Sequence, residues 1–210
     1  MVHIYHTQIS KEDHEYLMRN DLRKFPLDFQ EKIKRYKRWQ DAQLSLMGRL
    51  LLLRGIQEIY NLDYTNKTIF YTEYNKPYFN QDSIHFNISH SGNRVICAIT
   101  KRSEVGIDIE KISNIEIDDF EAQFSRNEWS KITHSSNQKK TFFDYWAQKE
   151  AVIKSHGHGL TIPLKSFEIS ENTTIINNQK FYLNEIKIDE EYKCYLSLKL
   201  SVDEIYIKQI

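Results

Sequence analysis

Each half of the 210-residue chain combines one long helix-type pattern with several short strand-type patterns. Apolar residues recur near helical spacing over residues 28–62, and residues 141–155 form a second helix candidate that ends before Gly157 and Gly159. The β-like runs are expected at residues 3–8, 69–74, 85–88, 94–100, 105–109, 167–170, 174–176, 181–188, 192–200 and 204–207. This pattern predicts an α+β fold.

The chain offers little material for a flexible linker, because it contains only three prolines and six glycines and no low-complexity segment. We predict two similar α/β lobes, residues 1–103 and 104–210, that meet near Lys101 to Glu104. A cleft between such lobes is a common ligand site, so we expect the active site there.

Charge and composition narrow the function classes. Lys plus Arg and Asp plus Glu each number 29, so no global field favours nucleic acid or an anionic membrane. The N-terminus lacks the pattern of a signal peptide, and the most apolar run, residues 44–56, is too short to span a bilayer. Cys97 lies in an apolar run and is predicted to be a buried thiol. We expect a monomer of the reducing cytoplasm.

The segment Gly106-Ile107-Asp108-Ile109-Glu110-Lys111 places two acids on one face of a strand. Side chains two residues apart point the same way, so Asp108 and Glu110 are presented together. Their carboxylates repel unless a cation lies between them, and oxygen ligands in small number suit Mg²⁺. The alternative is an exposed strand with two solvated acids.

The segment Trp146-Ala147-Gln148-Lys149-Glu150-Ala151-Val152-Ile153-Lys154 aligns Glu150 and Lys154 on one helix face, four residues apart. Glu150 would complete a metal site while Lys154 meets a phosphate of the same ligand. An ordinary surface ion pair is the alternative.

The turn Asn87-Ile88-Ser89-His90-Ser91-Gly92 separates two apolar runs. Backbone N–H groups and the His90 imidazole in such a turn can be directed at an anion. A plain hairpin turn has the same composition.

Taken together and in this order, these segments and the preceding Asn75-Lys76-Pro77-Tyr78 closely resemble the 4'-phosphopantetheinyl transferase superfamily, in its two-lobed, surfactin-synthetase-activating type. The resemblance spans residues 31–167. It implies transfer of the phosphopantetheine arm of coenzyme A to a serine of an apo acyl or peptidyl carrier protein.

The resemblance also implies roles for individual residues. It assigns Mg²⁺ binding to Asp108, Glu110 and Glu150, and coenzyme A binding to Lys32, Ser45, Lys76, Pro77, Ser89, His90 and Lys154. A further basic position of the family is Phe29 here, and Arg35 or Lys34 is a candidate replacement for the missing charge.

In the reaction that the resemblance implies, a serine hydroxyl displaces adenosine 3',5'-bisphosphate at the β-phosphorus of coenzyme A. Positioning and charge neutralisation supply most of the rate. Lys154 is expected to add positive charge there. Glu128, in Phe124-Ser125-Arg126-Asn127-Glu128, is the first candidate for the general base and Glu150 the second. Ser125 and Glu128 also have the form of a helix capping box.

The stretch after Glu110 is expected to dock the carrier protein, by analogy with the family, near Ile112, Ile115, Ile117 and Phe120. Core packing is the competing account of these residues. The main rival function is a nucleic-acid-binding module built on the basic run at residues 32–38, and the zero net charge argues against it. A second rival is a relative that binds coenzyme A or carrier proteins without catalysis.

Overall fold

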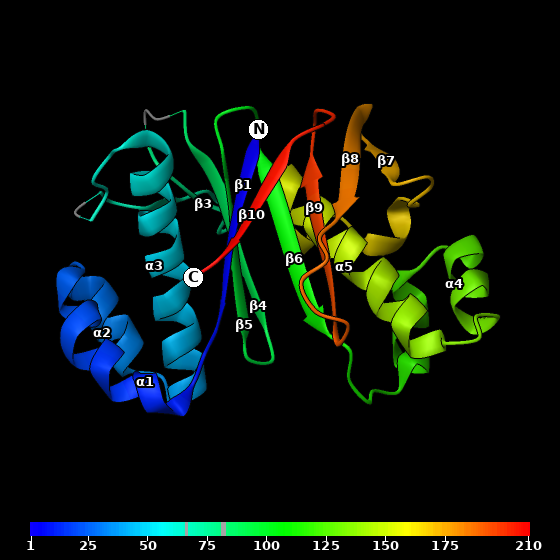
Figure 1. Ribbon diagram of the computed structural model, residues 1–210. Coiled ribbons are helices and arrows are strands. Elements are labelled where there is room, and N and C mark those ends of the chain that lie inside the picture. Colours follow the sequence, from blue (N-terminus) through cyan, green and yellow to red (C-terminus); the bar gives the residue numbers. More distant parts are fainter. Residues whose placement is uncertain (66, 81–82) are drawn as a thin grey trace.

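The computed structural model describes residues 1–65, 67–80 and 83–210 and contains two four-stranded sheets in two distinct regions (Figure 1). The first sheet has the order β10-β1-β5-β4, with β10 (Ile205–Gln209), β1 (Val2–Gln8), β5 (Arg94–Thr100) and β4 (His85–Ser91). The second has the order β6-β9-β8-β7, with β6 (Val105–Lys111), β9 (Tyr192–Leu198), β8 (Gln179–Glu185) and β7 (Thr173–Ile176). The predicted α+β class is confirmed.

The C-terminal strand returns to the first sheet. β10 pairs with β1 in parallel, with Val2 opposite Ile205, while β1 pairs with β5 in the antiparallel sense. Residues 205–209 therefore belong to the first sheet by their hydrogen bonds, although the sequence-based division assigned residues 104–210 to the second lobe.

The helices of the first region differ from the prediction of one helical stretch over residues 28–62. The chain forms α2 (Leu27–Lys34), turns at residues 35–38, and then forms α3 (Trp39–Tyr60). Ile33 of α2 packs in one apolar cluster with Ala42 and Leu46 of α3. A single continuous helix cannot fold back to make this contact, so tertiary packing explains the break.

Short helices that the sequence analysis missed precede α2. They are α1 (Lys11–Tyr16), the π-helical turn η1 (Leu17–Asp21) and the 3₁₀ turn η2 (Leu22–Lys24). The side chain of Ser10 caps α1 by accepting a hydrogen bond from the Asp13 N–H. Because this helix is short and buries none of its residues, apolar periodicity gave no signal for it.

The long helix of the second region, α5 (Gln138–His156), confirms the predicted helix and begins three residues earlier, at the Asn137 cap. It packs closely on β6 at Gly106. A Cβ atom at Gly106 would lie 2.1 Å from the Ala151 carbonyl oxygen and 2.3 Å from the Ser155 nitrogen, so glycine permits the direct contact of helix and strand backbones.

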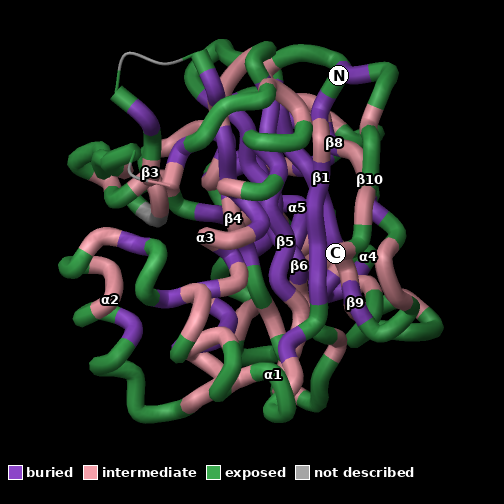
Figure 2. The backbone as a smooth tube through the Cα atoms, turned by 60° about the vertical axis from the view of Figure 1, so that its left-hand side comes forward, coloured by how far each residue is buried: buried purple, intermediate pink, exposed green. Residues whose placement is uncertain are grey.

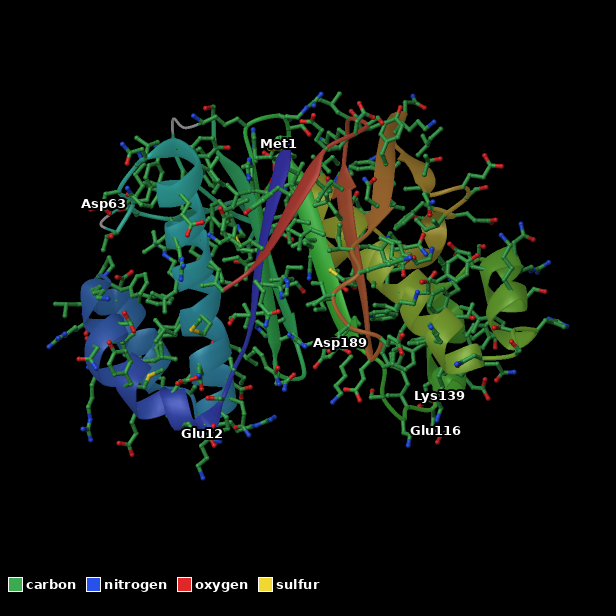
Figure 3. All side chains as sticks on the ribbon, viewed as in Figure 1. Met1, Glu12, Asp63, Glu116, Lys139 and Asp189 are labelled. Carbon is green, nitrogen blue, oxygen red and sulfur yellow. The ribbon has the colours of Figure 1, made fainter. Side chains whose placement is uncertain are left out.

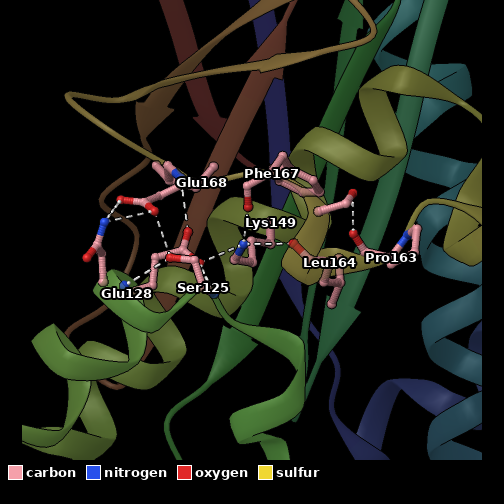
Figure 4. A network of polar contacts seen from close by, with 10 residues as sticks. Ser125, Glu128, Lys149, Pro163, Leu164, Phe167 and Glu168 are labelled. Atoms are coloured by element: carbon pink, nitrogen blue, oxygen red, sulfur yellow. Dashed lines mark hydrogen bonds and ion pairs between the residues drawn. The ribbon is translucent and has the colours of Figure 1, made fainter.

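The predicted strand at residues 167–170 is wrong. The 3₁₀ turns η4 (Gly159–Thr161) and η5 (Leu164–Ser166) precede this segment, which itself forms only a single bridge between Ser170 and Thr173. Its backbone groups bond to buried side chains instead of to a neighbouring strand: Lys149 donates to the carbonyls of Leu164 and Phe167 (Figure 4). Side-chain partners thus replace the β-ladder that the apolar pattern predicted.

The remaining elements are α4 (Arg126–Thr133), the 3₁₀ segment η3 (Ile117–Gln123) and the hairpin of β2 (Phe70–Tyr71) with β3 (Pro77–Tyr78). Buried backbone concentrates in the central strands and α5, whereas α1 and α2 are largely accessible (Figure 2). Cys97 is fully buried and free, which confirms the buried thiol. Within the described chain, no helix has the length and apolarity to cross a membrane.

Candidate active site

The two sheets meet where β4 and β6 lie side by side, and this junction carries the polar residues of two sequence motifs (Figure 1). Ser89 comes from β4 and Asp108 from β6. Helix α5 covers β6 and brings Glu150 and Lys154 to the same junction. Three segments that are far apart in sequence therefore contribute to one site.

Asp108 lies at the centre of this site and is only 3% exposed. Its Oδ1 atom accepts hydrogen bonds from the Ser89 hydroxyl at 3.0 Å and from Lys154 Nζ at 2.5 Å. Its Oδ2 atom is buried without a hydrogen-bond partner among the described residues. A buried carboxylate oxygen of this kind costs free energy unless a ligand satisfies it.

Glu110 and Glu150 extend the negative charge of the site. Burial, followed by the charge of Asp108, raises the pKa of Glu110 to about 7. The same two causes raise the pKa of Glu150. Burial is the larger cause in both cases and the charge of Asp108 adds to it, whereas the Lys154 ammonium opposes the shift of each pKa.

These features fit a divalent cation with oxygen ligands, since Asp108 has a buried, unpartnered oxygen and its charge acts on both Glu110 and Glu150. Among the described residues, no group of three or more His, Cys, Asp or Glu side chains is arranged so that it could hold a metal ion by itself. Mg²⁺ suits such an open arrangement, because it keeps several waters and binds through one or two carboxylates together with phosphates of a substrate.

His90 lies next to this site at the end of β4. His90 is an exposed residue, but neighbouring protein atoms partly remove water from its imidazole. This desolvation, followed by the charge of Lys154, lowers the pKa of His90. Asp108 and Asp41 act on it in the opposite direction. The imidazole is therefore within electrostatic reach of the acidic site and of α3.

Lys76 and Pro77 belong to the β2–β3 hairpin. Lys76 Nζ donates to the Val105 carbonyl at 3.4 Å and the Ser155 carbonyl at 3.3 Å, and it pairs with Glu104. A cavity of about 580 Å³ borders this group, lined among others by Tyr74, Tyr78, Glu104 and His158, with the Tyr74 and His158 rings stacked 4.6 Å apart. Lys76 thus joins the hairpin to the start of β6 at residues 104–105 and to the end of α5.

Lys32 is exposed on α2, and Ser45 is partly buried on α3. Lys32 lines a cavity of about 290 Å³ together with Phe29, Arg49 and Lys67. The Arg49 guanidinium lies 5.8 Å from the centre of the Phe29 ring and donates to the Lys67 carbonyl. Arg35, by contrast, extends along exposed α2 to Glu31. Arg49 therefore brings a positive charge beside Phe29.

Glu128 is not part of the acidic site. It is fully buried, its Oε2 atom accepts from the Ser125 N–H and lies 2.8 Å from Lys149 Nζ, and its Oε1 atom accepts from the Ile169 N–H (Figure 4). The capping box of Ser125 and Glu128 is confirmed. With no exposed surface and both oxygens bonded, Glu128 is placed as a structural residue, and this geometry speaks against the predicted role as a base.

The apolar residues of the stretch after Glu110 are partly buried and pack against an aromatic cluster that includes Phe124 and Phe142. This set consists of Ile112, Ile115, Ile117 and Phe120. Trp146 also belongs to the cluster, with its ring stacked on Phe142 at 5.7 Å. Packing accounts for much of the apolar character of this stretch.

Comparison with known proteins identifies the family of the chain. The model of the 4'-phosphopantetheinyl transferase superfamily matches residues 104–202, and that of the 4'-phosphopantetheinyl transferase N-terminal domain matches residues 12–102. The 4'-phosphopantetheinyl transferase gsp of Aneurinibacillus migulanus is 38% identical over 190 residues, which are 86% of this chain and 79% of that protein. The chain belongs to the 4'-phosphopantetheinyl transferase family.

Two further relatives indicate the type. A 4'-phosphopantetheinyl transferase of Bacillus subtilis is 34% identical over 78% of this chain and 77% of its own length. The 4'-phosphopantetheinyl transferase Sfp of Bacillus subtilis strain 168 is 37% identical over 66% of this chain and 63% of its own length. This chain is thus a phosphopantetheinyl transferase of the Sfp type.

Sequence reasoning about this transferase missed three residues of the site and its support. Ser91 donates to Glu110 Oε2 at 2.9 Å, Arg49 lies beside Phe29, and Lys149 pairs with Glu128. Ser91 and Lys149 stand inside the quoted motifs, so their position was visible but their partners were not. One feature of the sequence pointed to Arg49: it follows Ser45, a predicted coenzyme A contact, by four residues and so lies on the same face of the helix.

Proposed function

We propose that this protein transfers 4'-phosphopantetheine from coenzyme A to a serine hydroxyl of an apo carrier protein and releases adenosine 3',5'-bisphosphate. The observation that carries the proposal is the buried, unpartnered Oδ2 atom of Asp108 beside two acids with raised pKa values. Such a site gains stability from a cation, and Lys154 brings a second positive charge to the same place.

Asp108, Glu110 and Glu150 would hold Mg²⁺ in this proposal. The ion would neutralise charge on the pyrophosphate oxygens of coenzyme A and on the leaving group. The Lys154 ammonium lies 2.5 Å from Asp108 Oδ1, at the edge of the acid cluster, where it would contact a phosphate oxygen of the same substrate.

We assign the general base to Glu150. The serine oxygen attacks the β-phosphorus, the bond from that phosphorus to the bridging oxygen breaks, and the serine proton passes to the Glu150 carboxylate. Glu150 is partly accessible, so its carboxylate is open to the serine hydroxyl of a partner. Glu128 lacks this access because its side chain is fully buried.

Coenzyme A would lie along the junction of the two regions. Ser89 and His90 stand next to the acidic site, and Lys76 borders the cavity beside the β2–β3 hairpin, with Pro77 following it at the start of β3. Lys32 and Ser45 are the proposed contacts of the 3'-phosphate, and Arg49 takes the place of the basic residue expected at Phe29.

The carrier protein would dock near η3. The apolar residues Ile112, Ile115, Ile117 and Phe120 are only partly buried, so they combine support of the aromatic cluster with an accessible apolar edge. We propose that the protein acts as a cytoplasmic monomer without nucleic acid. In the basic run, Arg35 pairs with Glu31 and Arg38 lies 3.9 Å from Asp41, and exposed charges of both signs surround the molecule (Figure 3).

The test is intact-mass spectrometry of an apo acyl or peptidyl carrier protein incubated with this protein, coenzyme A and Mg²⁺. The expected result is a mass gain of one phosphopantetheine that is lost with EDTA and in Asp108→Ala. Asp203→Ala, at an exposed acid, is the matched control and should react like the natural protein. No gain with carriers of several pathways would contradict the proposal.

A further inference from the structure

On the edge of β6 that faces the first sheet, the backbone N–H groups do not pair with the backbone of a neighbouring strand. β6 pairs on its other side with β9, with Asp108 opposite Tyr195 and Glu110 opposite Lys193. In an antiparallel pair, alternate N–H groups point away from the partner strand. For β6 these are the N–H groups of Ile107, Ile109 and Lys111, which point toward β4.

Three side chains of β4 accept these hydrogen bonds. The Ile107 N–H donates to Asn87 Oδ1 at 2.8 Å, the Ile109 N–H to Ser89 Oγ at 3.3 Å, and the Lys111 N–H to Ser91 Oγ at 3.1 Å. Each acceptor precedes its donor by 20 residues, so the two strands run in the same direction. We call Asn87, Ser89 and Ser91 the polar zipper.

The two serines of the polar zipper also donate. Ser89 Oγ donates to Asp108 Oδ1 at 3.0 Å, and Ser91 Oγ donates to Glu110 Oε2 at 2.9 Å. Each hydroxyl therefore holds the backbone of β6 with its lone pair and the neighbouring carboxylate with its proton. A hydroxyl fixed in this way has one direction left for its proton, which determines where the carboxylate oxygen lies.

This arrangement acts on both acids of the strand at once. Asp108 and Glu110 are two residues apart in β6, so their carboxylates share a face of the strand and repel each other. Without external donors, the side chain of the partly exposed Glu110 would turn away into water. Hydrogen bonds from neutral donors keep the acids in place and leave their charge available to a cation.

We propose that the polar zipper fixes β6 against β4 and, through Ser89 and Ser91, presets the Asp108 and Glu110 carboxylates for a divalent cation, which makes Ser91 a positioning residue. The metal-binding part rests on the proposed function. Ser91 is the residue to test because Ser89 also contacts Lys154 and is a proposed coenzyme A contact.

The first experiment needs no metal and no substrate. Amide hydrogen exchange, measured by NMR in EDTA, should be faster at Lys111 in Ser91→Ala than in the natural protein, because the acceptor of that N–H is lost. Ser91→Thr keeps a hydroxyl and should retain the protection. Equal exchange rates in the natural protein and Ser91→Ala would overturn the zipper.

The second experiment measures Mn²⁺ affinity from the free-ion signal in electron paramagnetic resonance, with Mn²⁺ as an oxygen-seeking probe of the same charge. Loss of a group that orients a metal ligand weakens affinity by about 10- to 100-fold. We expect a loss of about tenfold in Ser91→Ala and near-natural affinity in Ser91→Thr.

The control variant is Ser10→Ala, which removes the cap of α1 far from the acids. It should lower the melting temperature without a change in Mn²⁺ affinity. If Ser91→Ala behaves like this control, or if the natural protein binds no Mn²⁺, the positioning role is overturned. Because neither readout uses a carrier protein, failure of phosphopantetheine transfer alone would contradict the proposed function and leave this result intact.

Discussion

Two neighbouring residues of α5, Lys149 and Glu150, lie in two ionic sites of opposite character. Lys149 meets Glu128 in a closed site, where Lys149 also bonds two carbonyls and Glu128 accepts from two N–H groups (Figure 4). Glu150 lies in an open site, where Lys154 pairs with Asp108 and its charge also acts on Glu110 and Glu150, and where one oxygen of Asp108 has no partner in the described structure.

A structural ion pair and a ligand site differ in whether the protein itself provides partners for all of their charged atoms. Both sites contain buried charge, so burial alone does not distinguish them. In the closed site every charged atom is satisfied by the protein, whereas the open site has unneutralised negative charge. The open site therefore depends on a ligand, and the closed site on the fold.

The largest effect is expected from breaking the closed site. Lys149→Met leaves Glu128 buried and unpaired, which costs about 3–5 kcal/mol in the free energy of unfolding. Urea denaturation measures this loss. The double variant Lys149→Met/Glu128→Gln removes both charges and should recover part of the stability. A Lys149→Met protein as stable as the natural one would contradict the closed-site interpretation.

The open site should respond in the opposite way. Asp108→Asn should slow transfer by about 100-fold or more, since a cation worth several kcal/mol in the transition state loses a ligand. Its melting temperature in EDTA should not fall, because one of the repelling charges is removed. Stopped mass-spectrometric time courses and thermal unfolding measure the two quantities. If Asp108→Asn lost much of its stability but retained transfer, Asp108 would be a structural residue and the open-site interpretation would be contradicted.

A smaller effect is expected at the cavity of Lys32 and Arg49. Arg49→Ala should raise the KM for coenzyme A by about five- to tenfold, the effect of one charge-assisted contact to phosphate. The KM for 3'-dephospho-coenzyme A should stay the same. Arg54→Ala, on the same helix but paired with exposed Glu58, is the control. Equal effects on both substrates would exclude a contact between Arg49 and the 3'-phosphate.

The smallest effect is a pH dependence of stability without metal. The pKa of Glu110 is raised from 4.5 to about 7 in the folded protein. Its contribution to stability is therefore fully present below 4.5 and is lost as the pH rises through about 7. In EDTA, the melting temperature of Glu110→Gln relative to the natural protein should increase over this window.

Two observations check this pH effect. Mg²⁺ added to the natural protein above about pH 7 should raise its melting temperature, because the ionised acids then bind the cation. Glu104 gives the internal contrast, since a hydrogen bond from His85 and the charge of Lys76 lower the pKa of Glu104 to about 2 against the effect of burial. The contribution of Glu104 to stability changes only below pH 4.5, so Glu104 does not disturb the measurement at higher pH. If the difference in melting temperature between Glu110→Gln and the natural protein were the same at about pH 5 and about pH 8, the role of Glu110 would be contradicted.

Much of the fold followed from periodicity. The strand at residues 94–100 was predicted with its observed bounds, and α5 differed only at its ends, because apolar repeats record which side of an element is buried. The break between α2 and α3 was not visible, since the residues on both sides of it suit a helix. The segment at residues 167–170 was misassigned because its apolar side chains are buried while its backbone bonds to Lys149 and Glu128.

The sequence by itself determined the chemistry that is available: the acids at positions 108, 110 and 150, the lysine at 154, and the order of motifs that marks the family. Residue type and local spacing are sufficient for these conclusions. Only the tertiary structure decided which charges are satisfied. Glu128 and Glu150 are the same residue type in the sequence, and their difference arises from partners that the fold brings from distant segments, including Lys149 and Ile169 for one and Asp108 for the other.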